Sequence, residues 1–164
     1  MHKVLIVGLI LAGAAAACSP AASTSTPDPG LQRQADLYGI EQLEVIFHKA
    51  ASSKDIELMM SIWADNATLV LGAQTYTGKA EIRDFFLNKS GPFKPANTWE
   101  GDTPAYKIVI TIDGDKGTLY YECHFIDVAT RAVASATASN QTVARINGVW
   151  LITNAVGGTA ILSP

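Results

Sequence analysis

The sequence of 164 residues lacks the motifs that several classes of functional site require. Its two cysteines and three histidines include no ligand-spaced pair such as His-x-His or Cys-x-x-Cys, so it predicts no metal site. No glycine-rich phosphate loop follows a strand and opens a helix, and no Gly-x-Ser-x-Gly motif is present, so we expect no cofactor. The 12 basic residues are scattered and the formal net charge is −3, which argues against a nucleic-acid partner.

A short apolar segment near the start predicts export. Lys3 precedes an unbroken run of small and apolar residues over 4–17, the pattern of a secretory signal peptide. The run is shorter than the ~20 residues of a membrane-spanning helix. Cys18 follows the last alanine directly, which resembles the cleavage site of bacterial lipoproteins and implies that residues 1–17 are removed and Cys18 carries the lipid. We therefore expect a membrane-anchored lipoprotein of the cell envelope; ordinary signal-peptidase cleavage, giving a soluble periplasmic or secreted protein, is the alternative.

The segment after Cys18 has the composition of a tether. Residues 18–30 are rich in Ser, Thr, Ala and Pro and contain no aromatic residue, so they bury too little apolar surface to fold. Residues 31–164 then have the usual size of one domain with one core. If Cys18 carries a lipid, Cys123 has no partner for a disulfide within the chain.

Residues 31–53 have the pattern of an amphipathic helix. Ile40 and Phe47 belong to its apolar face. Glu44 and His48 are assigned to the opposite, solvated stripe, where a pair one turn apart contributes only a few tenths of a kcal/mol. The sequence thus predicts a helix that packs against a sheet, and no catalytic role for His48.

A second helix, a strand and a third helix are expected next. Asp55 is a good N-cap for a helix whose apolar face extends to Trp63. Residues 67–71 are apolar and partly β-branched, which is typical of a strand. Thr77 is placed to cap a third helix over residues 80–87.

Strands dominate the remainder of the chain. After a connection rich in Gly, Pro and Asn, strongly β-forming segments alternate with turns, and Asn147-Gly148 is a strong hairpin signal. Helices followed by antiparallel strands predict an α+β fold with the helices on one face of the sheet. The predicted strands cover residues 105–112, 117–128, 132–146 and 149–155.

Four segments in a fixed order carry a family resemblance: the corner from Trp63 to Leu69, then Tyr76–Lys79, Ile112–Asp115 and Arg145–Ile152. Together they resemble the nuclear transport factor 2-like superfamily, in particular its SnoaL-like branch. The resemblance implies a cone-shaped fold, in which amino-terminal helices pack on a curved, mostly antiparallel sheet. It also implies a pocket for a small apolar molecule and, in many members, a homodimer formed through the outer sheet face.

The resemblance allows one catalytic mechanism to be tested. Ketosteroid isomerases of this superfamily place a tyrosine donor in the first helix and an aspartate base after the corner that this chain has at Ala64–Thr68. Counted from that corner without gaps, these positions fall on Phe47 and Leu71. A phenyl ring donates no hydrogen bond and an isobutyl group accepts no proton, so we do not expect that mechanism. Whether the chain is an enzyme stays open, and a noncatalytic role is favoured.

The best remaining candidate for chemistry is the segment around His124. Strand alternation puts Glu122 and His124 on one face, while the opposite face carries Tyr121, Cys123 and Phe125. In one interpretation His124 is a general acid or base with Glu122 as its neighbour. In the other, the opposite face packs into the core with Cys123 as an inert thiol, and His124 faces solvent or a dimer partner.

Six residues are candidates for contacts to a ligand inside the cone. Aromatic side chains supply contact area, tyrosine adds a polar group, and an asparagine beyond the apolar part of the last strand supplies an amide. Trp63 and Trp150 lie in regular apolar patterns and are assigned to the core instead. The candidates are Phe47, Tyr76, Trp99, Tyr121, Glu122 and Asn154.

These observations predict an envelope-anchored, SnoaL-like domain that binds a small apolar ligand with weak or no catalysis. One alternative is an enzyme of the cyclase, isomerase or dehydratase kind that acts through His124, which requires His124 to point into the cavity. The other is a homodimerising interaction module, which requires an apolar outer sheet face and no cavity of ligand size, ~300 Å³.

Overall fold

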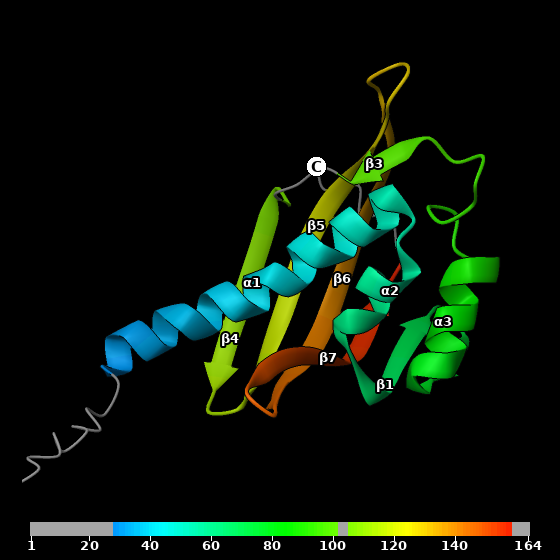
Figure 1. The fold of residues 1–164 in the computed structure, drawn as a ribbon. Coiled ribbons are helices and arrows are strands. Elements are labelled where there is room, and N and C mark those ends of the chain that lie inside the picture. Colours follow the sequence, from blue (N-terminus) through cyan, green and yellow to red (C-terminus); the bar gives the residue numbers. More distant parts are fainter. Residues whose placement is uncertain (1–27, 102–104, 159–164) are drawn as a thin grey trace, which may run out of the picture.

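The computed structural model describes residues 28–101 and 105–158, so the predicted signal peptide, Cys18 and most of the predicted tether lie outside the described residues. Three helices and seven strands are seen in the described part, with the helices gathered on one side of the sheet (Figure 1). The elements are α1 (Pro29–Ser53), α2 (Ile56–Ser61), β1 (Trp63–Leu71), β2 (Gln74–Thr77), α3 (Gly78–Asn88), β3 (Trp99–Gly101), β4 (Lys107–Asp113), β5 (Lys116–Asp127), β6 (Val133–Ile146) and β7 (Val149–Gly157).

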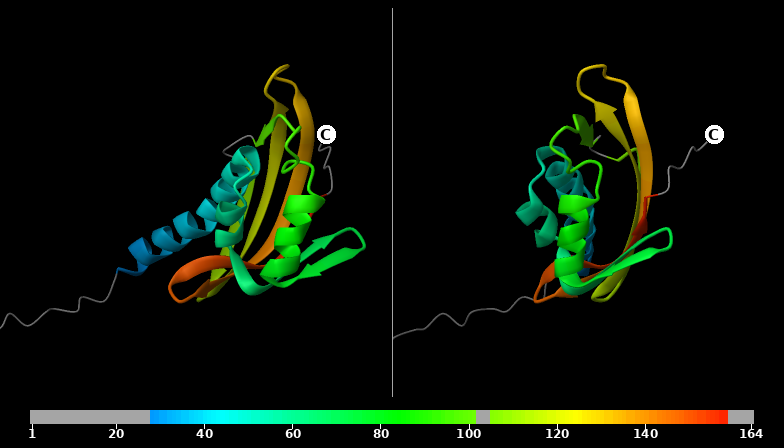
Figure 2. Two further views of the ribbon diagram at one scale, coloured as in Figure 1. Left: turned by 45° about the vertical axis from the view of Figure 1, so that its right-hand side comes forward. Right: turned by 90° about the vertical axis from the view of Figure 1, so that its right-hand side faces the viewer.

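The sheet has the strand order β2-β1-β7-β6-β5-β3, and β4 also pairs with β5. All pairs are antiparallel except β1 with β7, which is parallel. The long strands β5 and β6 curve around the helices, as Figure 2 shows. The predicted α+β cone, with amino-terminal helices on a curved and mostly antiparallel sheet, is confirmed.

Local signals explain where two of the helices begin. The carboxylate of Asp28 accepts a hydrogen bond from Gly30 N at the start of α1. Asp55 caps α2 as predicted, because its Oδ1 accepts from Leu58 N at 2.9 Å. Between these two helices Lys54 adopts a left-handed conformation with φ 57°, which turns the chain sharply.

The corner after α2 differs from the prediction. The helix ends at Ser61, and Trp63 already belongs to strand β1. The carbonyl of Ile62 accepts a hydrogen bond from Ile152 N at 2.8 Å, so pairing with β7 begins where another helical turn was expected. The helical spacing of Trp63 is therefore coincidental, and the strand pairing decides the local structure.

The short strands β2 and β3 were not predicted either. β2 pairs with the end of β1, and β3 pairs with the end of β5. Each is three or four residues long, so its pairing with a longer strand, rather than its own sequence, defines it.

The hydrophobic core lies between α1 and the concave face of the sheet. Ile40 from α1, Leu119 from β5, Val143 from β6 and Ile152 from β7 are all fully buried. No helix of the described residues is long and apolar enough to span a membrane.

Gly117 of β5 lies where no side chain fits between β4 and α1. A Cβ at this position would lie 2.5 Å from the carbonyl oxygen of Thr111 and 3.3 Å from both Ile40 and Val143. We expect Gly117→Ala to lower the free energy of unfolding by about 1–3 kcal/mol, because a backbone atom must move. Gly91→Ala is the control, since a Cβ there meets nothing within 4 Å. Equal unfolding midpoints for the two variants in urea would contradict this account.

Candidate functional site

The cone contains a cavity of about 320 Å³, partly open to solvent, between α1, α3 and the inner face of the sheet. All five phenylalanines of the chain line it, from α1, α3, the loop after α3 and β5. Trp63, Leu69 and Leu71 from β1 and Ala155 from β7 add further apolar walls. The lining therefore suits a small apolar molecule.

Two polar atoms in the lining are buried without a hydrogen-bond partner among the described residues: Trp63 Nε1 and Gln141 Oε1. The amide nitrogen of Gln141 is used differently, because it donates to Ser139 Oγ at 3.2 Å and to Tyr121 OH at 3.4 Å. Burial raises the pKa of Tyr121 above its ordinary value, so this hydroxyl stays protonated. The cavity thus offers one unused donor and one unused acceptor.

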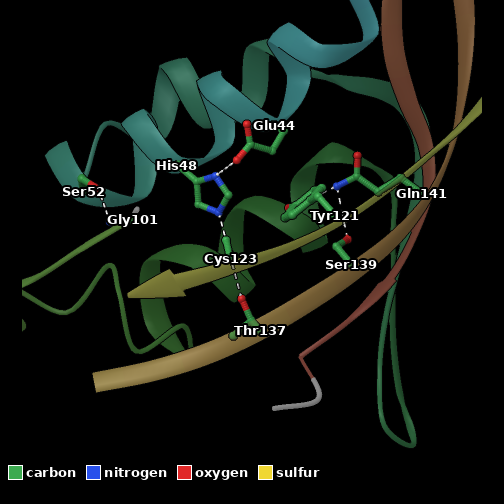
Figure 3. Close-up of polar contacts among 9 residues, drawn as sticks. All are labelled: Glu44, His48, Ser52, Gly101, Tyr121, Cys123, Thr137, Ser139 and Gln141. Atoms are coloured by element: carbon green, nitrogen blue, oxygen red, sulfur yellow. Dashed lines mark hydrogen bonds and ion pairs between the residues drawn. The ribbon is translucent and has the colours of Figure 1, made fainter. Parts of the chain in front are cut away.

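A chain of polar side chains connects α1 to β5 and β6 beside this cavity (Figure 3). Glu44 and His48 lie one turn apart on α1, with Oε1 2.6 Å from Nδ1. The carboxylate meets the ring off its N–H direction, so the contact is an ion pair rather than an aligned hydrogen bond. The other ring nitrogen, Nε2, lies 2.8 Å from Cys123 Sγ, which is 3.1 Å from Thr137 Oγ1.

This chain is closed to solvent. Glu44 and His48 are 0% exposed and Cys123 is 1% exposed. Burial by itself would lower the pKa of His48, but the contacts with Cys123 and Glu44 outweigh it and raise this pKa to about 9. The imidazole is therefore cationic at neutral pH.

The polar chain does not resemble a metal site. Glu44 and Cys123 contact opposite nitrogens of one ring, so the three groups share no central point. Across residues 28–101 and 105–158, no group of three or more His, Cys, Asp or Glu residues is arranged to hold a metal ion.

The cavity and the polar chain share a wall. Cys123 lies on the inner face of β5 between Tyr121 and Phe125, and both of these line the cavity. Its partner across the strand pair, Thr137, lines the cavity as well. On α1, the lining residue Phe47 directly precedes His48.

Of the predicted ligand contacts, Phe47 and Tyr121 line the cavity. Tyr76 packs against the lining residue Phe85, with ring centroids 4.9 Å apart, and Trp99 packs against Phe125 at 6.4 Å. Tyr76 and Trp99 therefore support the aromatic wall from behind and are not themselves part of the lining.

Asn154 is not part of the cavity lining either. It pairs with Thr142 of β6 and Thr68 of β1 in the sheet, on the face opposite Ala155 and Gln141. Its position in β7 thus turns the predicted amide away from the cone.

The remaining predicted residues lie on the outer face of the sheet. The ring of His124 stacks on Tyr106, with centroids 4.4 Å apart. Glu122 accepts hydrogen bonds from Tyr120 OH at 2.6 Å and Lys107 Nζ at 2.9 Å, which lower its pKa to about 2. Although it faces outward, Glu122 is only 2% exposed because these neighbours cover it. The predicted inward packing of the opposite strand face is confirmed.

The solvated stripe predicted for Glu44 and His48 is wrong, because both side chains are buried. A signal was available: Glu44 follows Ile40 by four residues, and His48 precedes Ala51 by three, so both continue the apolar face. Their polarity misled the assignment. The buried thiol of Cys123 is confirmed, but its contact with His48 was not predicted.

A family model described as SnoaL-like domain matches residues 32–156, and the chain therefore belongs to this family, within the nuclear transport factor 2-like superfamily. Among curated proteins, none matches the chain.

Many solved structures share the fold. A nuclear transport factor 2-like protein with a cystatin-like fold from Novosphingobium aromaticivorans is 18% identical, with a TM-score of 0.70 over 85% of this chain and 94% of that one. Hexachlorocyclohexane dehydrochlorinase LinA-type3 from Novosphingobium barchaimii is 19% identical, with a TM-score of 0.64 over 82% and 96% of the two chains. At these identities the likeness establishes the fold alone.

His48 makes the stability of the fold depend on pH. Its pKa rises from 6.5 in the unfolded chain to about 9, so the stabilisation is complete below about pH 6.5 and is lost as the pH rises through about 9. The stabilisation lost over this pH range is at most about 3 kcal/mol. The groups that face the ring are Glu44 on α1 and Cys123 and Tyr121 on β5.

In urea denaturation of the wild type, we expect the free energy of unfolding to fall as the pH rises from about 6.5 to about 9. This fall should be absent in His48→Gln. His124→Gln is the control, because it replaces a histidine on the outer face and should keep the wild-type dependence. The same pH dependence in His48→Gln as in the wild type would show that another group is responsible.

Proposed function

We propose that this SnoaL-like domain binds a small, mostly apolar molecule that carries one polar group. The observation that supports this proposal is the cavity of about 320 Å³, whose apolar walls hold the unused donor Trp63 Nε1 and the unused acceptor Gln141 Oε1. A buried polar group without a partner costs about 1–3 kcal/mol. A ligand with a carbonyl or hydroxyl group removes that cost when it binds, which favours it over a pure hydrocarbon.

The size of the cavity limits the ligand. A volume of about 320 Å³ is at the lower end of ligand pockets, which suits a molecule of one or two fused rings. One structural relative is named as a dehydrochlorinase of hexachlorocyclohexane, a small apolar ring compound. A ligand of that general size in this fold agrees with the proposal.

The alternatives have less support. His124 lies on the outer face and does not line the cavity, so an enzyme acting there through His124 is not favoured. Phe47 and Leu71 do line the cavity, and neither side chain transfers a proton. The exposed Val109 and Val156 on the outer face leave homodimer formation as a second, compatible role.

We also propose that lipidation of Cys18 anchors this domain to a membrane of the cell envelope. The support is the apolar run of residues 4–17 directly before Cys18. In bacteria that process lipoproteins, the wild type is expected in the membrane fraction, and Cys18→Ser in the soluble fraction or unprocessed. Equal fractionation of both, with an unmodified Cys18 in the mass spectrum, would exclude the anchor.

The ligand proposal is tested with naphthalene and 1-naphthol, which have similar size and differ in one hydroxyl group. We expect both to bind, and 1-naphthol to bind about 5- to 10-fold more tightly because its O–H can donate to Gln141 Oε1. Gln141→Leu keeps the volume but removes the acceptor, so the preference for 1-naphthol should disappear while naphthalene still binds. Fluorescence titration measures both affinities.

The matched control is Asn140→Leu, which changes the neighbouring residue on the exposed, opposite face of β6. It should bind both compounds as the wild type does. If neither compound binds the wild type, the cavity is not a ligand site; if the preference persists in Gln141→Leu, the polar group is recognised elsewhere.

A further inference from the structure

The buried polar chain has the parts of an activated nucleophile. A thiol reacts as its thiolate, which forms when a neighbouring base takes the proton. A third group orients that base. Here Cys123 Sγ lies 2.8 Å from His48 Nε2, and the opposite ring nitrogen lies 2.6 Å from Glu44 Oε1. The order nucleophile, base and orienting carboxylate is complete within side chains that are nearly inaccessible to water.

Structural roles explain this arrangement poorly. A buried ion pair is often no more stabilising than apolar residues of the same volume. Both oxygens of Glu44 lack a hydrogen bond from the described residues, although the side chain is 0% exposed. Cys123 forms no disulfide, and a thiol that served only as filler would not need a charged imidazole against its sulfur.

The location of Cys123 connects this chemistry to the cavity. The thiol lies between the lining residues Tyr121 and Phe125 on one strand face, and Thr137 Oγ1, also in the lining, lies 3.1 Å from the sulfur. The sulfur thus lies directly behind the cavity wall, in contact with an atom of a lining residue.

We propose that Cys123 is a nucleophilic thiol, served by His48 and Glu44, that adds to small electron-poor alkenes such as α,β-unsaturated ketones in the cavity. The inference rests on the proposed function, because the alkene must enter the same space. Acyl transfer fits less well, since Cys123 lies in the middle of β5 and not at a helix start or tight turn where backbone N–H groups converge on an oxyanion.

The addition balances without a further reactant. For the addition, His48 Nε2 already holds the proton of the thiol, so the sulfur reacts as a thiolate beside an imidazolium that the ion pair with Glu44 stabilises. The thiolate forms a C–S bond to the β-carbon of the alkene, and the electron pair of the double bond moves to the α-carbon. That carbon takes the proton from Nε2, so the N–H bond and the π bond of the alkene are replaced by S–C and C–H bonds and His48 is left neutral.

The test uses the full chain and 2-cyclohexen-1-one, with the adduct quantified by mass spectrometry on the peptide that contains Cys123, so that Cys18 does not contribute. We expect the folded protein to form the adduct faster than the chain unfolded in guanidinium chloride. Between about pH 6 and about pH 8 the rate should change little, whereas a free thiol reacts about tenfold faster per pH unit in this range. Naphthalene should protect Cys123 by occupying the cavity.

Two variants distinguish the loss of the base from a general effect of replacing a histidine. His48→Gln should slow the addition by about 100-fold, the usual contribution of a positioned base. The control is His124→Gln, which changes a histidine on the outer face of β5, the strand that carries Cys123. This variant should react as the wild type does. The pH profile of the wild type tests the same claim even if His48→Gln does not fold.

The outcomes distinguish the two proposals. If naphthalene binds and Cys123 forms no adduct, or if His48→Gln reacts as fast as the wild type, the nucleophile proposal is wrong and ligand binding stands. If Cys123 reacts without protection by naphthalene, the alkene does not arrive through the cavity and this proposal also fails. If neither naphthalene binds nor an adduct forms, both proposals fail.

Discussion

The contact on which the rest of the site depends is the buried chain from Glu44 through His48 to Cys123. It crosses the space between α1 and β5, where most other contacts are apolar. Apolar contacts alone would allow α1 to shift along the sheet. Charges that are shut off from water must keep their partners, so this contact holds α1 in one register on the sheet. The same register directs Phe47, the neighbour of His48, into the cavity.

The cavity exists because the cone is not filled by its own side chains. Rings from α1, α3 and β5 meet at its walls, and such rings pack edge to face or tilted against one another. The orphaned atoms of Trp63 and Gln141 occur in this unfilled part of the fold. Apolar walls with a few unsatisfied polar atoms are a costly arrangement for an empty core and a suitable one for a ligand.

The fold was largely predictable from the sequence, as were the cavity residues Phe47 and Tyr121, whereas the buried polar chain was not. The segments that became β4 to β7 show strand patterns and turn signals that act locally, and the cap at Asp55 is local as well. The parallel pairing that makes Trp63 part of β1 is a long-range contact that no local pattern reports. The burial of His48 could be inferred from its place on the apolar face of α1, but its contact with Cys123 could not, because the two residues are 75 positions apart in the chain.

The site depends on a charged imidazole that is held in the core between a carboxylate and the sulfur of Cys123. The most direct test is the ¹⁵N NMR spectrum of the His48 ring at neutral pH. The account predicts protons on both Nδ1 and Nε2, with the ring losing one of them only near pH 9. A neutral ring with a single protonated nitrogen at neutral pH would contradict it.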